Sequence, residues 1–427
     1  MPMPSVASLL PKSHQNRWDF RRYFPWGWML VLAALFHLLS AAPLLVNAPP
    51  LELWLSLVLY PLAEWLFLFC LRHIGKQRRL ELELLGCWLS GIGLVISGSI
   101  LPGYAWRQAA AIVCGMFLYA ATLWVVADVN RAMKLRPIVA GAAIALLALN
   151  LALAGFTNGQ RNWISIGGFS FQPSELVKLA FIFVGGATLD RLQRTQSILR
   201  YLIFALCCVG VLFTIRDFGT ALIFFATFLL IVFLRSGDLR TIALVVAAAA
   251  MGAALVLIFR SSVADRFRVY RHVWENMNAA GYQQTRVLIY SSSGGLLGLG
   301  LGNGKLRNVF AASTDLVFGM LCEEWGLLLA FLVPLCYLAI AIFTLRAARR
   351  ARSSFHSIIA VSAAGLLLFQ ASLNIFGITD LLPLTGVTLP FVSRGGTSLL
   401  AAWGLLAFMR SAFAGAGTLR DKKPKTH

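Results

Sequence analysis

Long apolar stretches recur along the whole sequence, and they restrict its possible folds more than any other feature. Each stretch has about 17–25 mostly apolar residues, enough for one helix to cross the ~30 Å hydrocarbon core of a bilayer. Hydrophobic residues fill 59% of the 427 positions and charged residues only 13%, and the mean hydropathy is +0.77. A soluble domain of this length needs more polar surface, and the alternating pattern of a membrane β-barrel is absent. The sequence therefore predicts an all-α, polytopic membrane protein.

About twelve transmembrane helices are predicted, as a ten-helix core preceded by an extra hairpin. The expected spans are residues 27–48, 51–71, 81–101, 108–127, 137–155, 172–189, 199–215, 219–234, 241–258, 316–345, 355–376 and 389–410. Residues 1–79 would form the cytoplasmic N-terminus and the hairpin, residues 80–413 the core with its long polar loop 259–315, and residues 414–427 a basic tail. Because hydrophobic spans follow the N-terminal segment immediately, we expect no cleaved signal peptide there.

The distribution of positive charge predicts how the helices are oriented. The net charge is +20, a value that in a soluble protein suggests nucleic-acid binding. Here most Lys and Arg residues fall in alternate loops and at both ends of the chain, whereas the short loops of the other side hold only Arg107, Arg161 and Arg216. This is the positive-inside bias. It places both termini in the cytoplasm and the long loop outside, and it indicates membrane lipids rather than nucleic acid as the surroundings.

Asp315 is the acidic residue whose position most needs an explanation. It follows the long loop and begins an apolar run, Leu316–Leu345. An unpaired buried carboxylate is costly, so this one must be solvated, paired or used in function. Capping of the next helix is the simplest structural role for Ser313–Asp315. Further along the same helix, at least one of the pair Glu323–Glu324 is expected to face a hydrated interior.

Other charged residues also lie in or beside the predicted spans. Glu175 and Lys178 are three residues apart, so they share a helix face and can form an ion pair or line a polar cavity. Asp217 can cap the eighth helix, or it can bind a charged headgroup together with Arg216 at the outer mouth. Glu64, within the second span, is a lesser functional candidate.

The long loop combines arginines with a glycine-rich run. Its arginines include Arg260, Arg266, Arg268, Arg271 and Arg286. The run Gly294–Gly304 is not a Walker A loop, because Leu299 and Leu306 replace the required Gly and Ser or Thr. It can still bind an anion through backbone N–H groups and nearby guanidinium groups, or it can be a flexible re-entrant loop. Downstream, the prolines and glycines of residues 383–398 should break a helix, which at membrane depth is tolerated only against protein or a water-filled cavity.

Five ordered segments resemble the motifs of one family. They are residues 160–178, Asp217–Ala221, Tyr282–Gln283 with Gly294–Gly304, Thr314–Asp315 with Glu323–Gly326, and Pro383–Ser398. Together they are similar to the SEDS family (shape, elongation, division and sporulation), which includes RodA and FtsW. The resemblance covers roughly residues 80–413, and the ten predicted core spans agree with the family's ten.

The resemblance implies a peptidoglycan glycosyltransferase that polymerises lipid II at the outer face of the bacterial cytoplasmic membrane, together with a class B penicillin-binding transpeptidase. It makes Asp315 the catalytic residue, which would deprotonate or orient the acceptor hydroxyl. Arginines, with a divalent cation (Mg or Mn) as an option, would stabilise the leaving pyrophosphate; no other cofactor is implied. The expected substrate-binding residues are Glu175, Lys178, Asp217, Arg216, Arg286, Gln283, Thr314, Ser393 and Arg394.

Three features depart from the family pattern. Ala311–Ser313 stand where the family usually has Pro-Glu-x-His, Arg394 stands where it usually has Tyr, and the N-terminal hairpin is additional. Two other functions therefore stay open: a flippase for the lipid-linked precursor, gated by Glu175 and Lys178, and a non-catalytic scaffold that recruits a transpeptidase. The shared motifs do not separate roles in elongation, division and sporulation.

Overall fold

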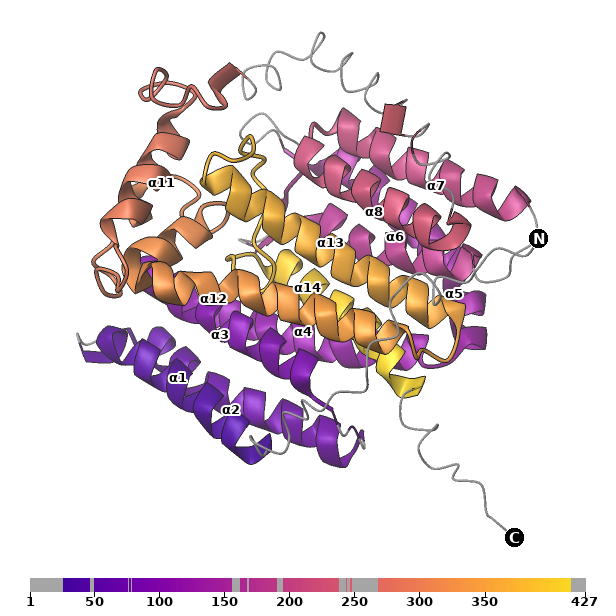
Figure 1. Ribbon diagram of the computed structural model, residues 1–427, viewed down its shortest axis with the longest axis horizontal. Helices are drawn as coiled ribbons and strands as arrows, with labels where there is room; N and C mark the ends of the chain where they lie inside the picture. The colour runs from indigo at the N-terminus through magenta and orange to yellow at the C-terminus, as the bar shows by residue number, and fades with distance from the viewer. Residues whose placement is uncertain are drawn as a thin grey trace.

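The computed structural model describes residues 26–46, 50–75, 77, 79–155, 162–166, 169–189, 195–237, 243, 246–247 and 268–415, and within them the chain is almost entirely helical (Figure 1). The helices are α1 (Trp26–Val46), α2 (Leu51–His73), α3 (Glu81–Ile100), α4 (Ala105–Val126), α5 (Val129–Leu153), α6 (Pro173–Leu189), α7 (Thr195–Thr214), α8 (Phe218–Ser236), α11 (Tyr282–Ser293), α12 (Val317–Ala348), α13 (Ser354–Ile378) and α14 (Gly396–Ser411). The described residues also include the short 3₁₀ helices η3 (Pro102–Tyr104), η4 (Leu306–Asn308) and η5 (Ala412–Gly415).

Seven helices of the described chain are long and apolar enough to cross a membrane, and two shorter apolar helices, Leu30–Leu45 and Leu199–Thr214, accompany them. This confirms the predicted all-α, polytopic membrane protein. The predicted ninth span, 241–258, lies outside the described residues apart from 243, 246 and 247.

The other predicted spans correspond to helices, but some boundaries are wrong. Helix α5 begins at Val129 instead of 137, because the Asp128 carboxylate caps it by accepting from the Asn130 N–H at 2.9 Å. Helix α14 begins at Gly396 instead of 389, since the chain before it is non-helical, as the prolines and glycines there predict. The long polar loop is also less irregular than expected, because it contains α11 and η4.

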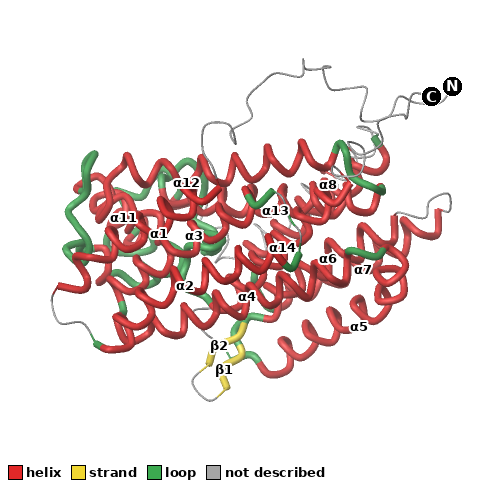
Figure 2. Tube along the Cα trace, turned by 90° about the horizontal axis from the view of Figure 1, so that it is seen from below, coloured by secondary structure: helices red, strands yellow, loops and turns green. Residues whose placement is uncertain are grey.

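A small β-hairpin, which the sequence did not predict, connects α5 to α6. Strands β1 (Ile164–Ile166) and β2 (Phe169–Phe171) pair antiparallel, with Ile164 opposite Phe171. Figure 2 shows the hairpin at the edge of the helical body, beside the end of α5. It leads the chain into Gln172, just before α6 begins.

Helix α14 lies at the centre of the bundle, where it packs mainly against α4, α13 and α6 (Figure 1). Almost all of its residues are buried. The fully buried ring of Trp403 meets Phe67 and Tyr119 edge to face. Gly115 of α4 permits this approach, because a Cβ at that position would lie 2.4 Å from Trp403 Cδ1. Close contact at small residues is the usual means of holding helices together in a bilayer.

The extra hairpin of α1 and α2 packs against α3 and α4 (Figure 1). Its two helices meet at a buried polar contact, in which His37 Nδ1 lies 3.3 Å from Glu64 Oε2. The Phe36 ring packs against Trp88 of α3 and Trp325 of α12. Glu64, the lesser functional candidate, therefore has a pairing partner within the hairpin.

One end of the bundle carries a series of arginines. Those at helix ends include Arg79, Arg131, Arg235, Arg349 and Arg410. The Arg410 side chain is itself mostly buried, with its Nε 3.4 Å from Glu83 Oε1, and the Tyr119 hydroxyl donates to the same carboxylate oxygen at 2.6 Å. By the positive-inside rule this end faces the cytoplasm. The structure thus gathers at one end of the bundle the arginines from which the sequence predicts the cytoplasmic side.

Helix α12 is broken at Gly326, where φ is +80° and ψ is 167°. The break frees two carbonyls and two N–H groups, which the glycine-rich run Gly294–Gly304 satisfies. The four hydrogen bonds run from Leu299 N to Glu323 O (2.9 Å), Gly300 N to Glu324 O (3.0 Å), Leu327 N to Gly295 O (3.0 Å) and Leu328 N to Leu296 O (3.3 Å). Interrupted backbone in a membrane needs such partners. The run Gly294–Gly304 is therefore an ordered part of the fold that packs against α12 at Gly326.

Substitution of Gly326 by Ala tests this arrangement. A Cβ at Gly326 would lie 2.4 Å from both Gly298 N and Leu296 O, and the positive φ disfavours any side chain. We expect Gly326→Ala to lower the free energy of unfolding by about 2–6 kcal/mol, from backbone strain and overpacking together. Thermal unfolding of the purified protein in detergent measures the change.

Gly141→Ala is the matched control. Gly141 lies within α5, and a Cβ there meets no atom within 4 Å. Since Ala is the better helix former, this variant should unfold at the wild-type temperature or slightly above it. Equal behaviour of the two variants would show that the run does not depend on the break at Gly326.

Candidate active site

A pocket of about 810 Å³ lies at the end of the bundle opposite the arginine-rich end. Its walls come from the end of α3, the starts of α6 and α8, and the segments that precede α12 and α14. Since the arginines mark the cytoplasmic side, the pocket lies on the extracytoplasmic side.

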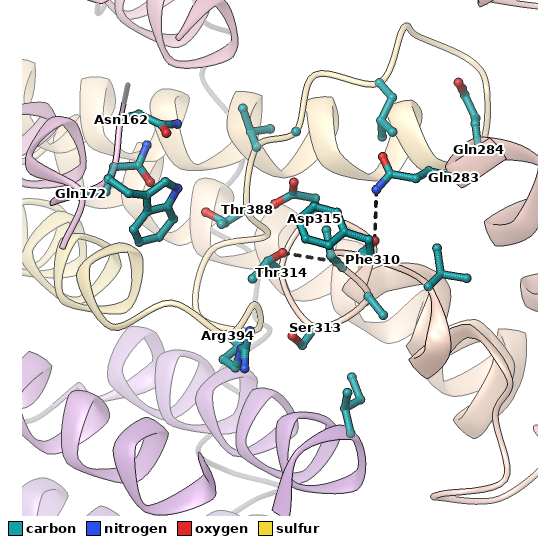
Figure 3. Close-up of a pocket in the computed structure, with 18 of the residues that line it drawn as sticks. Asn162, Gln172, Gln283, Gln284, Phe310, Ser313, Thr314, Asp315, Thr388 and Arg394 are labelled. Atoms are coloured by element: carbon teal, nitrogen blue, oxygen red, sulfur yellow. Dashed lines mark hydrogen bonds between the residues drawn. The ribbon is translucent and has the colours of Figure 1, made fainter. Parts of the chain in front are cut away.

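Asp315 lies in the wall of this pocket and is half-buried. Figure 3 shows it between Thr388 and Gln283, which come from opposite sides of the cavity. The prediction that Ser313–Asp315 cap the next helix is wrong. Leu316 occupies the N-cap position without a side-chain cap, because the chain makes a tight turn in which the Asp315 and Leu316 N–H groups both donate to the Ala311 carbonyl. Asp315 therefore stands two residues before the first residue of α12, Val317, and lies at the pocket surface.

The backbone of Ser313–Asp315 is held by hydrogen bonds to three consecutive carbonyls. The donors are Arg394 N to Ser313 O (2.8 Å), Ser393 Oγ to Thr314 O, and Asn374 Nδ2 to Asp315 O (2.8 Å). All three donors come from α13 or from the broken segment 379–395 that follows it. A segment far along the chain thus fixes the position of the acid.

Two further acids line the pocket, and both have partners. Asp217 caps α8 by accepting from the Thr220 N–H at 3.1 Å, as predicted, and it also accepts from the Gln172 side-chain amide at 3.2 Å. Glu175 lies 2.7 Å from Lys178 Nζ, which confirms the predicted ion pair. The ion pair is buried, and its Glu175 member also lines the pocket. Glu175 therefore has both predicted roles, as an ion-pair partner and as part of a polar cavity wall.

Lys178 lies behind Glu175 and does not reach the pocket. Its Nζ also donates to the Gln370 side-chain oxygen at 2.9 Å, and the Gln370 amide donates to the Thr388 carbonyl at 2.9 Å. The Thr388 hydroxyl is in turn 2.7 Å from the Ser398 hydroxyl. This polar chain links α6, α13 and the start of α14 beneath the pocket.

Arg394 and Arg307 are the cationic residues in the described pocket wall. The Arg394 guanidinium lies 5.7 Å from the centre of the Tyr104 ring. Partial burial lowers the pKa of Arg394 from its usual range, but an arginine remains protonated at neutral pH. Arg307 Nη1 donates to the Gly302 carbonyl at 2.7 Å. These two residues are placed to attract an anionic group into the pocket.

The structure brings together most, but not all, of the residues predicted for the site. Glu175, Asp217, Gln283, Thr314, Asp315 and Arg394 line the pocket. Four others do not: Lys178, Arg216, Arg286 and Ser393. Ser393 instead holds backbone groups, and Arg286 stacks on Tyr282 with its guanidinium 5.2 Å from the ring centre. Contact of these side chains with substrate stays a prediction.

Several other predicted functional residues lie away from the pocket. Arg260 and Arg266 are outside the described residues, and Arg268 and Arg271 are not in the pocket wall. Glu323 and Glu324 are fully buried and do not line it either. The Glu323 carboxylate accepts from the N–H groups of Lys305 and Leu306, and Glu324 accepts from the Ser99 hydroxyl. They hold the loop and α3, in place of the expected contact with a hydrated interior.

Sequence reasoning missed some residues of the wall. These are chiefly Asn162, Trp163, Gln172, Thr220, Gln284, Arg307 and Thr388. Asn162, Trp163 and Gln172 fall within the family motif at residues 160–178, and Arg307 follows the glycine-rich run. Their positions in the sequence therefore indicated that they could belong to the site. Within the described parts of the chain no three His, Cys, Asp or Glu side chains gather as a metal site.

Comparison with known proteins relates these features to one family. The family model described as "Cell cycle protein", for FtsW, RodA and SpoVE, matches residues 97–413. The peptidoglycan glycosyltransferase RodA of Mycobacterium leprae is 30% identical over 286 residues, which are 63% of this chain and 62% of that protein. The stage V sporulation protein E of Bacillus subtilis is 32% identical over 252 residues, 57% of this chain and 68% of that protein. The match thus spans less than two thirds of the length of the mycobacterial relative.

A solved structure has the same fold. It is a chain of a peptidoglycan synthase complex, described as coordinating polymerization and crosslinking. It superposes with a TM-score of 0.63 at 25% sequence identity, covering 81% of this chain and 99% of that one. The extra hairpin lies ahead of the matched family region. This chain belongs to the FtsW, RodA and SpoVE family, the SEDS family, and is a multi-pass protein of the bacterial cytoplasmic membrane.

Proposed function

We propose that this protein is a peptidoglycan glycosyltransferase that polymerises lipid II at the outer face of the membrane. The observation that carries the proposal is the position of Asp315, a half-buried carboxylate in the wall of a large extracytoplasmic pocket that also presents Arg307 and Arg394. Relatives described as peptidoglycan glycosyltransferases support the same reaction.

The residues of the pocket suit this chemistry. Asp315 accepts the proton of the acceptor sugar hydroxyl, or orients that hydroxyl, as the oxygen attacks the anomeric carbon of the donor. The bond to the lipid pyrophosphate breaks, and Arg307 and Arg394 stabilise the negative charge that grows on the leaving group. Attack from the side opposite the leaving group inverts the anomeric centre. A divalent cation bound with the pyrophosphate stays a prediction, as do substrate contacts by Gln283 and Thr314.

A class B penicillin-binding transpeptidase is the proposed partner. The support is the similarity to a chain of a peptidoglycan synthase complex that coordinates polymerization and crosslinking. Transport of the precursor without bond formation is less well supported, because Glu175 and Lys178, the residues expected to gate the headgroup, neutralise each other in a buried pair. A pure scaffold would not need the acid at the pocket surface.

Replacing Asp315 by Asn tests the catalytic role. The amide has nearly the same size but cannot accept the hydroxyl proton, so we expect glycan strand synthesis from lipid II to fall at least about 100-fold. The measurement is gel analysis of the polymer made by the purified protein, with and without a candidate transpeptidase. Asp128→Asn is the control, because Asp128 caps α5 at the cytoplasmic end and Asn caps equally well. Near-normal synthesis by Asp315→Asn would refute the proposal.

Removing one partner of the Glu175–Lys178 pair tests whether this ion pair stabilises the polar chain beneath the pocket. Lys178→Met leaves the Glu175 carboxylate buried without its cation, which should lower the free energy of unfolding by about 3–5 kcal/mol. The double variant Glu175→Gln with Lys178→Met removes both charges and should recover most of that loss. Thermal unfolding in detergent compares the three proteins; a stable Lys178→Met protein would contradict the assigned role of the pair.

A further inference from the structure

Asn374 is one of the three residues that donate hydrogen bonds to the backbone carbonyls of Ser313–Asp315. Asn374 lies on α13, one turn before the helix ends at Ile378, and only 3% of its surface is exposed. It does not line the pocket. Its side chain therefore acts on the pocket only through the groups to which it binds.

Both hydrogens of the Asn374 amide are used. Its Nδ2 donates to the Asp315 carbonyl at 2.8 Å and to the Val387 carbonyl at 2.7 Å. Because both partners are carbonyl oxygens, only the NH₂ end of the amide can lie between them, and this fixes the orientation of the side chain. Charge-neutral bonds of this length in a buried site are costly to leave unmade.

The two carbonyls belong to two adjacent segments of the pocket wall, which are far apart in the sequence. Asp315 comes from the loop before α12, whereas Val387 comes from the broken segment after α13, and both line the cavity. Gly386, next to Val387, has a φ of +73°, and a Cβ there would lie 3.5 Å from Asp315 Oδ2. The carboxylate thus faces the turn that Asn374 also holds, so one amide fixes the position of the acid relative to this neighbouring turn.

We propose that Asn374 is a positioning residue for Asp315 in the glycosyl transfer reaction, and this inference rests on the function proposed above. By bridging the Asp315 turn and the Gly386–Val387 turn it holds the carboxylate where the acceptor hydroxyl must lie. Misplacement of a reacting group by about 1 Å can cost about 100-fold in rate. Substrate binding, which depends on other residues of the wall, does not require the bridge.

Asn374→Leu tests the inference, since Leu fills a similar volume but donates no hydrogen bond. We expect kcat for lipid II polymerisation to fall about 10- to 100-fold while KM changes by less than about twofold. Asn374→Gln keeps two donors on a longer side chain and should fall between Leu and the wild type. A kcat within about twofold of the wild type in Asn374→Leu, or a rise in KM with kcat unchanged, would overturn the proposal.

Asn150→Leu is the matched control. Asn150 is fully buried on α5, and its side-chain atoms have no hydrogen-bond partner within the described residues. The same substitution there should leave kcat unchanged. A loss of kcat equal to that of Asn374→Leu would show a general effect of removing a buried amide and would overturn the assigned role.

Hydrogen exchange measured by mass spectrometry gives a readout that does not depend on activity. The Asp315 and Leu316 N–H groups donate to the Ala311 carbonyl in the turn that Asn374 supports. In Asn374→Leu we expect peptides covering 311–316 and 384–388 to exchange at least about 10-fold faster, with the rest of α13 unchanged. Unchanged exchange in both peptides, or equal acceleration throughout the chain, would overturn the inference. Absence of polymer in the wild type would instead refute the proposed function, and the exchange result would still decide the role of Asn374.

Discussion

The hydrogen bonds between the Asp315 segment and the broken chain after α13 are the interaction on which the pocket depends. Within a membrane, backbone groups that leave a helix must find partners in the protein. The segment 379–395 and the turn before α12 are both non-helical, and each provides the partners of the other. The same bonds that make this backbone tolerable hold Asp315 at the pocket surface.

The pocket explains how the Asp315 carboxylate is accommodated at the mouth of a membrane protein. Asp315 is half-buried in a wall that also presents Arg394 and Arg307. Two other acids of the described wall, Asp217 and Glu175, cap α8 and pair with Lys178. Arg394, which departs from the family pattern, adds a cation where the proposed reaction develops negative charge.

The parts of the site that depend on neighbouring residues could be predicted from the sequence. The Glu175–Lys178 pair follows from helix spacing, and the Asp217 cap follows from its position before an apolar run. The break before α14 follows from its prolines and glycines. Contacts between distant segments could not be predicted: the seating of the Gly294–Gly304 run in α12 needs the positive φ of Gly326, which sequence pattern alone does not reveal.

The same limit explains why the role of Asp315 was only partly foreseen. Its position before an apolar helix favoured capping, but a tight turn moves the helix start past it. Mass spectrometry of the products that the purified protein makes from lipid II decides whether the pocket transfers a glycosyl group. We expect one lipid pyrophosphate to be released for every glycosidic bond formed. Precursor that remains intact, or that only moves across a liposome membrane, would contradict glycosyl transfer by the pocket.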